Sequence, residues 1–143
     1  MIKMMHSGWA YITLLLLIIA VVNAIIGLTS KKEFKDKDLR ISLFTLIVTH
    51  IQILIGFIAY FTSAQFAFLR ENGMGEAMKE SEIRLVVIEH PLMMILAVVL
   101  ITIGFSKHKS KTTDKEKFKT ITIYYGLALL FVLSKIPWNQ WLN

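Results

Sequence analysis

The chain has 143 residues, of which 55% are hydrophobic, and a formal net charge of +6 at pH 7. Ordinary soluble domains are roughly 45–50% apolar, so the composition excludes that class and predicts a membrane protein. The sequence contains no cysteine, which excludes disulfides and thiolate metal sites. A bound metal would therefore need histidine, methionine or carboxylate ligands.

Four apolar segments are each close to the roughly 20 residues that a helix needs to cross a bilayer. They span approximately residues 4–28, 41–62, 85–105 and 121–138. Helices joined by short connections are antiparallel neighbours. The sequence therefore predicts an all-α integral membrane protein in which residues 1–143 form one domain, an antiparallel bundle of four transmembrane helices.

The first segment has one face rich in small side chains, which let membrane helices approach closely. Residues spaced alternately by four and three positions share this face. They are His6, Ala10, Thr13, Leu17, Ala20, Ala24 and Gly27. The apolar run is longer than the roughly 7 to 15 residues of a signal-peptide core, so we interpret it as a retained anchor.

The charge pattern predicts the topology. Residues 31–40 and 106–119 hold five and six of the sixteen Lys and Arg residues, whereas residues 63–84 are mildly acidic. The positive-inside rule places both basic connections in the cytoplasm and both termini outside, as expected for a multi-pass membrane protein. Because the basic residues only flank apolar spans, we expect a lipid bilayer as partner and no nucleic acid.

The second segment carries a comparable stripe of small and polar residues. It consists of Thr45, Thr49, Gln52, Gly56, Ala59 and Ser63. His50 lies on nearly the opposite side, about 9 Å deeper in the membrane than His90. Its interpretation stays open between a third metal ligand, a contact with another protein and a hydrogen-bonded core residue.

In the next connection we expect a short amphipathic piece that breaks at Gly-Met-Gly, residues 73–75.

The third segment contains Glu89, His90 and Pro91 just inside its start. A titratable group inside an apolar span is costly unless it is used or compensated, so a functional role for His90 is favoured. At 1.5 Å per residue, His6 and His90 lie roughly 3 Å and roughly 8 Å below the outer surface. We therefore predict that these two histidines face each other inside the bundle.

Two histidines on different membrane helices in apolar surroundings suit haem, because iron takes axial imidazoles and the apolar shell helps to set its potential. We predict b-type haem between His6 and His90. Arg84 and Lys135 are expected near its propionates, since long cationic side chains extend toward the interface. An outer aromatic belt is expected from Trp9, Trp138 and Trp141.

Simpler interpretations compete with ligation. His6 can be an interfacial polar residue, and His108, in a basic connection, is expected to be solvated. Methionine combined with imidazole also suits copper, although methionine is a common gap-filler in helix bundles. The methionines predicted on the outer half are Met1, Met4, Met5, Met74, Met78, Met93 and Met94.

Glu89 and Pro91 flank the histidine of the third segment. Glu89 has three interpretations: an ion pair with Lys135 or Arg84, a hydrogen bond that orients a histidine, or a proton relay. Pro91 lacks a backbone donor, so it frees a carbonyl near the predicted site and can kink the helix.

Several stretches carry a family resemblance: "MHSGWAY" in the first helix, "THIQILIGFIAYF" in the second, "EHPLMMILAVVLITIGFSK" in the third and "IPW" closing the fourth. Over nearly the whole chain they resemble a family of small bacterial four-helix membrane proteins labelled cytochrome b-like. That resemblance implies that the chain lies in a bacterial inner (cytoplasmic) membrane. More distantly, the pattern is similar to one half of haem A synthase. That similarity implies haem ligation by His6 and His90 and leaves His50 out, but the synthase's catalytic acid motif has no strong match here.

The expected function is one-electron transfer by a membrane b-type haem protein, with quinone or a redox protein as partner. We find no catalytic nucleophile with its base, phosphate-binding loop or paired catalytic carboxylates, so electron transfer is expected rather than independent enzyme activity. The alternative is a non-catalytic accessory subunit of a larger membrane complex, without cofactor, whose histidines only make interhelical hydrogen bonds.

Overall fold

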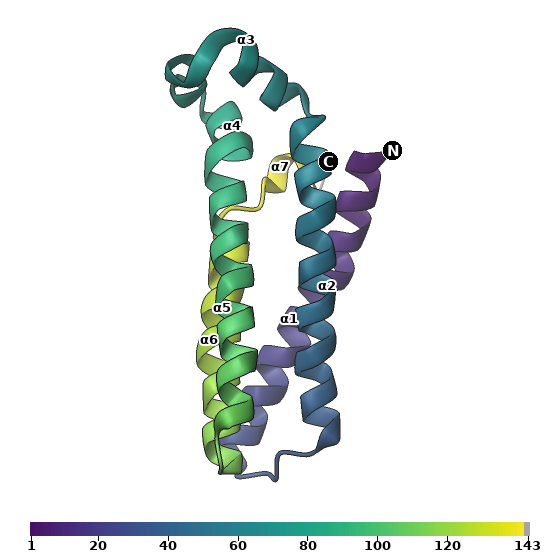
Figure 1. Cartoon of the computed structure of the whole chain (residues 1–143), viewed down its shortest axis with the longest axis vertical. Coiled ribbons are helices and arrows are strands. Elements are labelled where there is room, and N and C mark those ends of the chain that lie inside the picture. The colour runs from purple at the N-terminus through teal and green to yellow at the C-terminus, as the bar shows by residue number, and fades with distance from the viewer. Residues whose placement is uncertain (142–143) are drawn as a thin grey trace.

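The computed structural model describes residues 1–141, and every regular element in that range is a helix. Four long helices run side by side (Figure 1). They are α1 (Ile2–Thr29), α2 (Asp36–Phe61), α5 (His90–Ser110) and α6 (Asp114–Ser134). The short helix α4 (Ser81–Arg84) and the π-helical turn η1 (Leu85–Glu89) lead directly into α5, so residues 81–110 form one continuous span.

The four spans are long and apolar enough to cross a membrane, as the sequence predicted. Contacts run from α1 to α2, α2 to α5, α5 to α6 and α6 back to α1. The helices therefore form a closed four-helix bundle in which α1 and α5 face each other across the diagonal.

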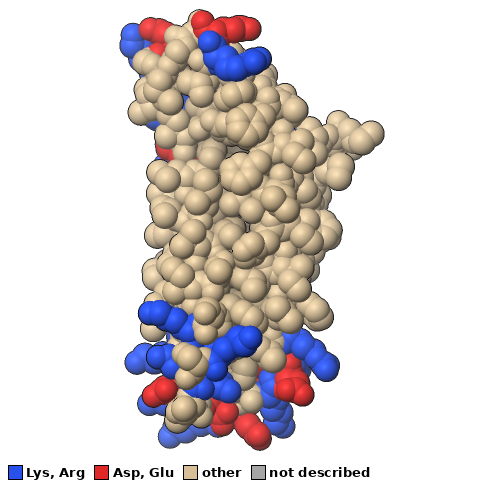
Figure 2. All heavy atoms as spheres, viewed as in Figure 1, with Lys and Arg blue, Asp and Glu red and all other residues tan. Residues whose placement is uncertain are grey.

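The two basic connections lie at the same end of the bundle, which we call the basic end (residues 30–35 and 111–113) (Figure 1). The opposite, terminal end carries both chain ends, α3 (Ala64–Lys79) and α7 (Trp138–Trp141). Figure 2 shows charged side chains gathered at the two ends, separated by a broad band without visible Lys or Arg. This distribution is that of a multi-pass membrane protein.

Helices α2 and α6 begin before the predicted apolar segments because their polar flanks form capped first turns. At α2, Asp38 Oδ2 accepts from the Lys35 amide at 2.9 Å in a capping box. At α6, the Thr113 hydroxyl accepts from the Glu116 amide at 3.2 Å. The fourth span ends at Ser134 and not at residue 138 as predicted, because Pro137 disfavours helical backbone at the residue before it.

The connection between the second and third spans contains the predicted break. Gly73 has φ +86° and ψ 168°, a conformation that L side chains rarely adopt. It divides α3 into two short helical pieces that lie across the terminal end of the bundle (Figure 1).

The tightly packed core lies in the half of the bundle nearer the basic end. Tyr125 is fully buried, and its hydroxyl donates to the Ser42 carbonyl at 2.8 Å, which links α6 to α2. The small-residue face of the first helix is buried here, as predicted. The core comprises Leu17, Ala20, Val21, Ala24, Ala97, Ile101, Phe105, Phe118, Ile121, Tyr125 and Ala128.

Gly104 sets the approach of α5 to α6, and this gives the first prediction. A Cβ added at Gly104 would lie 2.4 Å from Tyr124 Cβ, so Gly104→Ala forces the helices apart and should cost about 1–3 kcal/mol. Gly126 on α6 has no neighbour within 4 Å of such a Cβ, so Gly126→Ala is the matched control. Thermal unfolding in detergent should show a lower midpoint for Gly104→Ala only. Equal midpoints for the two variants would contradict this packing.

Candidate functional site

His6 and His90 come together near the terminal end. His6 projects from α1 and His90 begins α5, so they approach across the diagonal of the bundle. Their ring centroids are 6.2 Å apart and the ring planes meet at 85°. The predicted proximity of the two histidines is therefore observed, whereas His50 takes no part in the pair.

His90 is fixed by the end of the fourth span. Its Nδ1 lies 2.9 Å from the carbonyl oxygen of Lys135. A carbonyl only accepts, so Nδ1 of His90 carries the proton and Nε2 is left with a free lone pair. The Lys135 carbonyl is available because α6 ends at Ser134, and carbonyls at a helix end have no partner within the helix.

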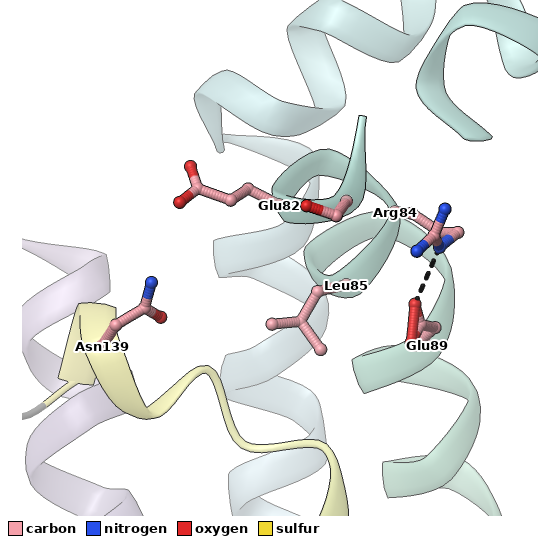
Figure 3. Close-up of a pocket in the computed structure, with 6 residues that line it drawn as sticks. Glu82, Arg84, Leu85, Glu89 and Asn139 are labelled. Atoms are coloured by element: carbon pink, nitrogen blue, oxygen red, sulfur yellow. Dashed lines mark hydrogen bonds and ion pairs between the residues drawn. The ribbon is translucent and has the colours of Figure 1, made fainter. Parts of the chain in front are cut away.

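Glu89 is held by two cations (Figure 3 shows the first). Its carboxylate accepts from Arg84 Nε at 3.1 Å and from Lys135 Nζ at 2.6 Å. Ion pairing with Arg84 or Lys135 was one of the three predicted interpretations, and the structure shows both pairs at once. Lys135 thus contacts two consecutive residues: its side chain binds Glu89 and its carbonyl binds His90.

Pro91 frees a carbonyl, as predicted, and α2 supplies its partner. In an α-helix the amide of residue 91 would donate to the carbonyl of Val87, but proline has no N–H. The Tyr60 hydroxyl donates to the Val87 carbonyl instead, at 3.0 Å. The preceding turn is π-helical, with the His90 amide donating to the Leu85 carbonyl. Such π turns are frequent at functional sites.

His6 is held by the polar stripe of α2. Gln52 Nε2 lies 3.1 Å from His6 Nδ1 and 3.0 Å from the His6 carbonyl. A Cβ on Gly56 would lie 3.2 Å from His6 Cε1, so the glycine gives the ring room against α2. Gln52 Oε1 is buried and has no hydrogen-bond partner within residues 1–141. A buried acceptor left unpaired is costly and points to a missing donor.

The terminal half of the bundle is less tightly packed than the rest. Of the described residues in its four spans, only Val87 has a fully buried apolar side chain on this side of the main core. Gln52, Tyr60 and both paired histidines are instead half-buried. The histidine pair therefore lies where the bundle has polar groups and few close-packed apolar contacts.

A cavity of about 360 Å³ opens beside the ion pairs (Figure 3). Arg84, Leu85 and Glu89 line it from the third span, and Asn139 lines it from α7. Figure 3 shows Glu82 and Asn139 on the side away from the Arg84–Glu89 pair. The cavity gives the charged neighbours of His90 access to the exterior.

The other two histidines lie away from the pair. His50 is exposed, with Nδ1 2.8 Å from the Leu46 carbonyl and Nε2 3.4 Å from Thr102 Oγ1. His108 is only 1% exposed, so the expectation of a solvated residue is wrong. Helix α5 continues through Ser110, which places the His108 ring among Phe34 and Phe105.

The aromatic and methionine residues of the terminal end divide into several roles. Trp9 Nε1 donates to the Val48 carbonyl at 3.0 Å, so this tryptophan joins α1 to α2. Trp141 stacks on Tyr11 with centroids 4.5 Å apart. The methionines with exposed side chains are Met1, Met4, Met5, Met74 and Met78.

Residues 1–141 contain no group of three or more His, Asp or Glu side chains placed to hold a metal ion.

Sequence reasoning missed the residues that support the histidines. The stripe of α2 placed Gln52 and Gly56 on the bundle side, but their contact with His6 depends on helix register. Nothing in the sequence identified the Lys135 carbonyl as a partner of His90 except Pro137, which marks where the helix must end.

Comparison of the chain with family models, curated proteins and solved structures finds no match.

The Tyr60 hydrogen bond gives the second prediction. Tyr60→Phe leaves the Val87 carbonyl unpaired and should cost about 1–3 kcal/mol of unfolding free energy. Pro91→Ala restores the backbone N–H, so the same Tyr60 change should cost less in that background. The free energy of unfolding in mixed detergent is measured for wild type, Tyr60→Phe, Pro91→Ala and the double variant. Equal costs in the two backgrounds would show that Tyr60 does not compensate for Pro91.

Proposed function

We propose that the protein binds b-type haem between His6 and His90 and functions in one-electron transfer. The observation that carries the proposal is the approach of two imidazoles from diagonally opposite helices, with centroids 6.2 Å apart. A single metal ion held by both imidazoles through bonds of about 2 Å would set the ring centroids about 6 Å apart. His90 donates through Nδ1, so its Nε2 is the nitrogen left for iron. His6 Nδ1 accepts from the Gln52 amide, so the His6 proton would have to move from Nε2 to Nδ1 when iron binds.

Three further features fit haem. His90 donates its Nδ1 proton to a carbonyl, the arrangement usual for a metal-bound histidine. The terminal half buries few apolar side chains, so no close-packed core holds its helices together around the two histidines. Arg84 lines the adjacent cavity and provides a cation for a propionate, while Lys135 lies on the other side of Glu89. When bound, haem supplies a single electron-accepting and electron-donating centre whose potential depends on its surroundings.

The protein's own residues then have separate tasks. His6 and His90 hold the cofactor, Gln52 and Lys135 orient the two rings, and the apolar helices exclude water. By the positive-inside rule, we propose that the basic end faces the cytoplasm of a bacterium and the histidine site faces outward. An electron partner, either quinone or a redox protein, would approach from that side.

The third prediction tests the cofactor and its ligands. Purified protein should show a reducible haem spectrum, and His6→Ala or His90→Ala should abolish it because each removes one of the two imidazoles that would hold the haem. His50→Ala is the control, since His50 faces Thr102 outside the pair, and should retain the spectrum. Haem that persists in both ligand variants would contradict the ligand assignment.

One observation favours a second candidate function. His50 is exposed in the middle part of α2, on the face shared with Thr102 of α5. A titratable group that faces lipid at this depth is costly unless another protein covers it. Protein purified without any haem absorption would contradict the cytochrome proposal and favour an accessory subunit that packs through this face.

The fourth prediction concerns Gln52. A neutral imidazole that binds iron through Nε2 carries its proton on Nδ1, which then needs an acceptor. Rotation of the Gln52 amide would present its unpaired Oε1 to His6 Nδ1, at the cost of the hydrogen bond that Gln52 Nε2 donates to the His6 carbonyl. Gln52→Leu should therefore weaken haem retention about 10- to 100-fold, whereas Gln52→Glu should preserve it. Haem titration of each purified variant measures the effect. Equal retention in wild type and Gln52→Leu would contradict this role.

A further inference from the structure

A second cavity lies at the basic end, on the α5–α6 hairpin. Its volume is about 320 Å³, which is near the lower end of the roughly 300–1,000 Å³ of small-molecule sites. The end of α5 and the first half of α6 supply its walls. The lining residues are Lys107, Lys111, Glu116, Lys119, Thr120, Ile123 and Tyr124.

The charge of this cavity favours an anion. Three lysines line it against one carboxylate, that of Glu116. Lys107 Nζ lies 5.5 Å from the centroid of the Tyr124 ring, so a cation–π contact holds one ammonium group against the cavity wall. Lys111 and Lys119 are exposed and can move toward a bound group.

The position of the cavity favours a lipid over a soluble anion. Thr120, Ile123 and Tyr124 follow the lysines along α6 toward the apolar part of that span. The Thr120 hydroxyl donates to the Glu116 carbonyl at 2.7 Å and so retains its own lone pairs. The lining of the cavity therefore changes from ammonium groups to apolar side chains over two helical turns. A phospholipid changes in the same order, from its charged phosphate to its apolar acyl chains. Basic pockets between membrane helices are known to bind such headgroups.

We infer that the cavity lined by Lys107, Lys111 and Lys119 binds the phosphate of an anionic phospholipid in the leaflet at the basic end. The ammonium groups contact the phosphate, and Ile123 with Tyr124 contacts the glycerol and upper acyl chain. Glu116 opposes the negative charge and limits the affinity. The site lies at the opposite end of the bundle from His6 and His90, so it does not depend on haem.

The experiment is a titration of purified full-length protein in neutral detergent with phosphatidylglycerol, followed by native mass spectrometry. Phosphatidylcholine, phosphatidylethanolamine and inorganic phosphate form separate arms. The cavity variant carries Lys107→Gln, Lys111→Gln and Lys119→Gln. The matched control carries Lys31→Gln, Lys32→Gln and Lys37→Gln, which remove the same charge at the same end but do not line the cavity.

Wild type and the control should bind phosphatidylglycerol at least tenfold tighter than phosphatidylcholine. The cavity variant should lose roughly 100-fold in affinity, since each lysine near an anionic headgroup contributes about a factor of five. Glu116→Gln should bind phosphatidylglycerol more tightly than wild type. Equal losses in the two triple variants would overturn the site.

Two other results would overturn the identity of the ligand. Displacement of phosphatidylglycerol by millimolar inorganic phosphate would show a site for a soluble anion. Preference for phosphatidylethanolamine, combined with weaker binding in Glu116→Gln, would show that Glu116 binds an ammonium headgroup.

Discussion

Polar groups inside the apolar part of this bundle must find their hydrogen-bond partners within the protein, since lipid offers none. The segment Glu89–Pro91 shows how this requirement shapes the structure. Glu89 needs a cation, His90 needs an acceptor, and Pro91 leaves a carbonyl that needs a donor. Lys135 satisfies the first two through its side chain and its carbonyl, and Tyr60 satisfies the third. Three spans are thereby fixed to one another around His90.

The same requirement explains where the bundle is dense and where it is not. Near the basic end, small residues on α1 and Gly104 on α5 allow close packing. Tyr125 is fully buried there, and its hydroxyl donates a hydrogen bond to the Ser42 carbonyl. Near the terminal end, polar side chains replace the close-packed core. Hydrogen bonds and ion pairs, and not a close-packed apolar core, therefore hold the spans together at the terminal end.

Much of the fold could be predicted from the sequence because hydropathy and charge encode spans and connections directly. Four spans, both basic connections at one end and the break at Gly73 followed from local patterns. The depth estimates also placed His6 and His90 at similar depths in the membrane. The end of the fourth span was misplaced because its apolar run continues past the point where Pro137 stops the helix.

The details of the site required the three-dimensional register. Spacing along one helix cannot show that Gln52 lies on His6, that Tyr60 reaches Val87 or that the Lys135 carbonyl faces His90. His108 was misjudged for a related reason. Its lysine neighbours indicate a solvated connection, but the helix continues and turns this one side chain onto Phe34 and Phe105.

The most direct test of the histidine pair as a haem site is the electron paramagnetic resonance spectrum of the oxidised, purified protein. The ring planes of His6 and His90 meet at 85°. Haem held by His6 and His90 would give a low-spin ferric signal, with the strong anisotropy that follows if the two rings keep this angle. A high-spin signal typical of a single axial ligand, or no ferric haem signal, would contradict the account.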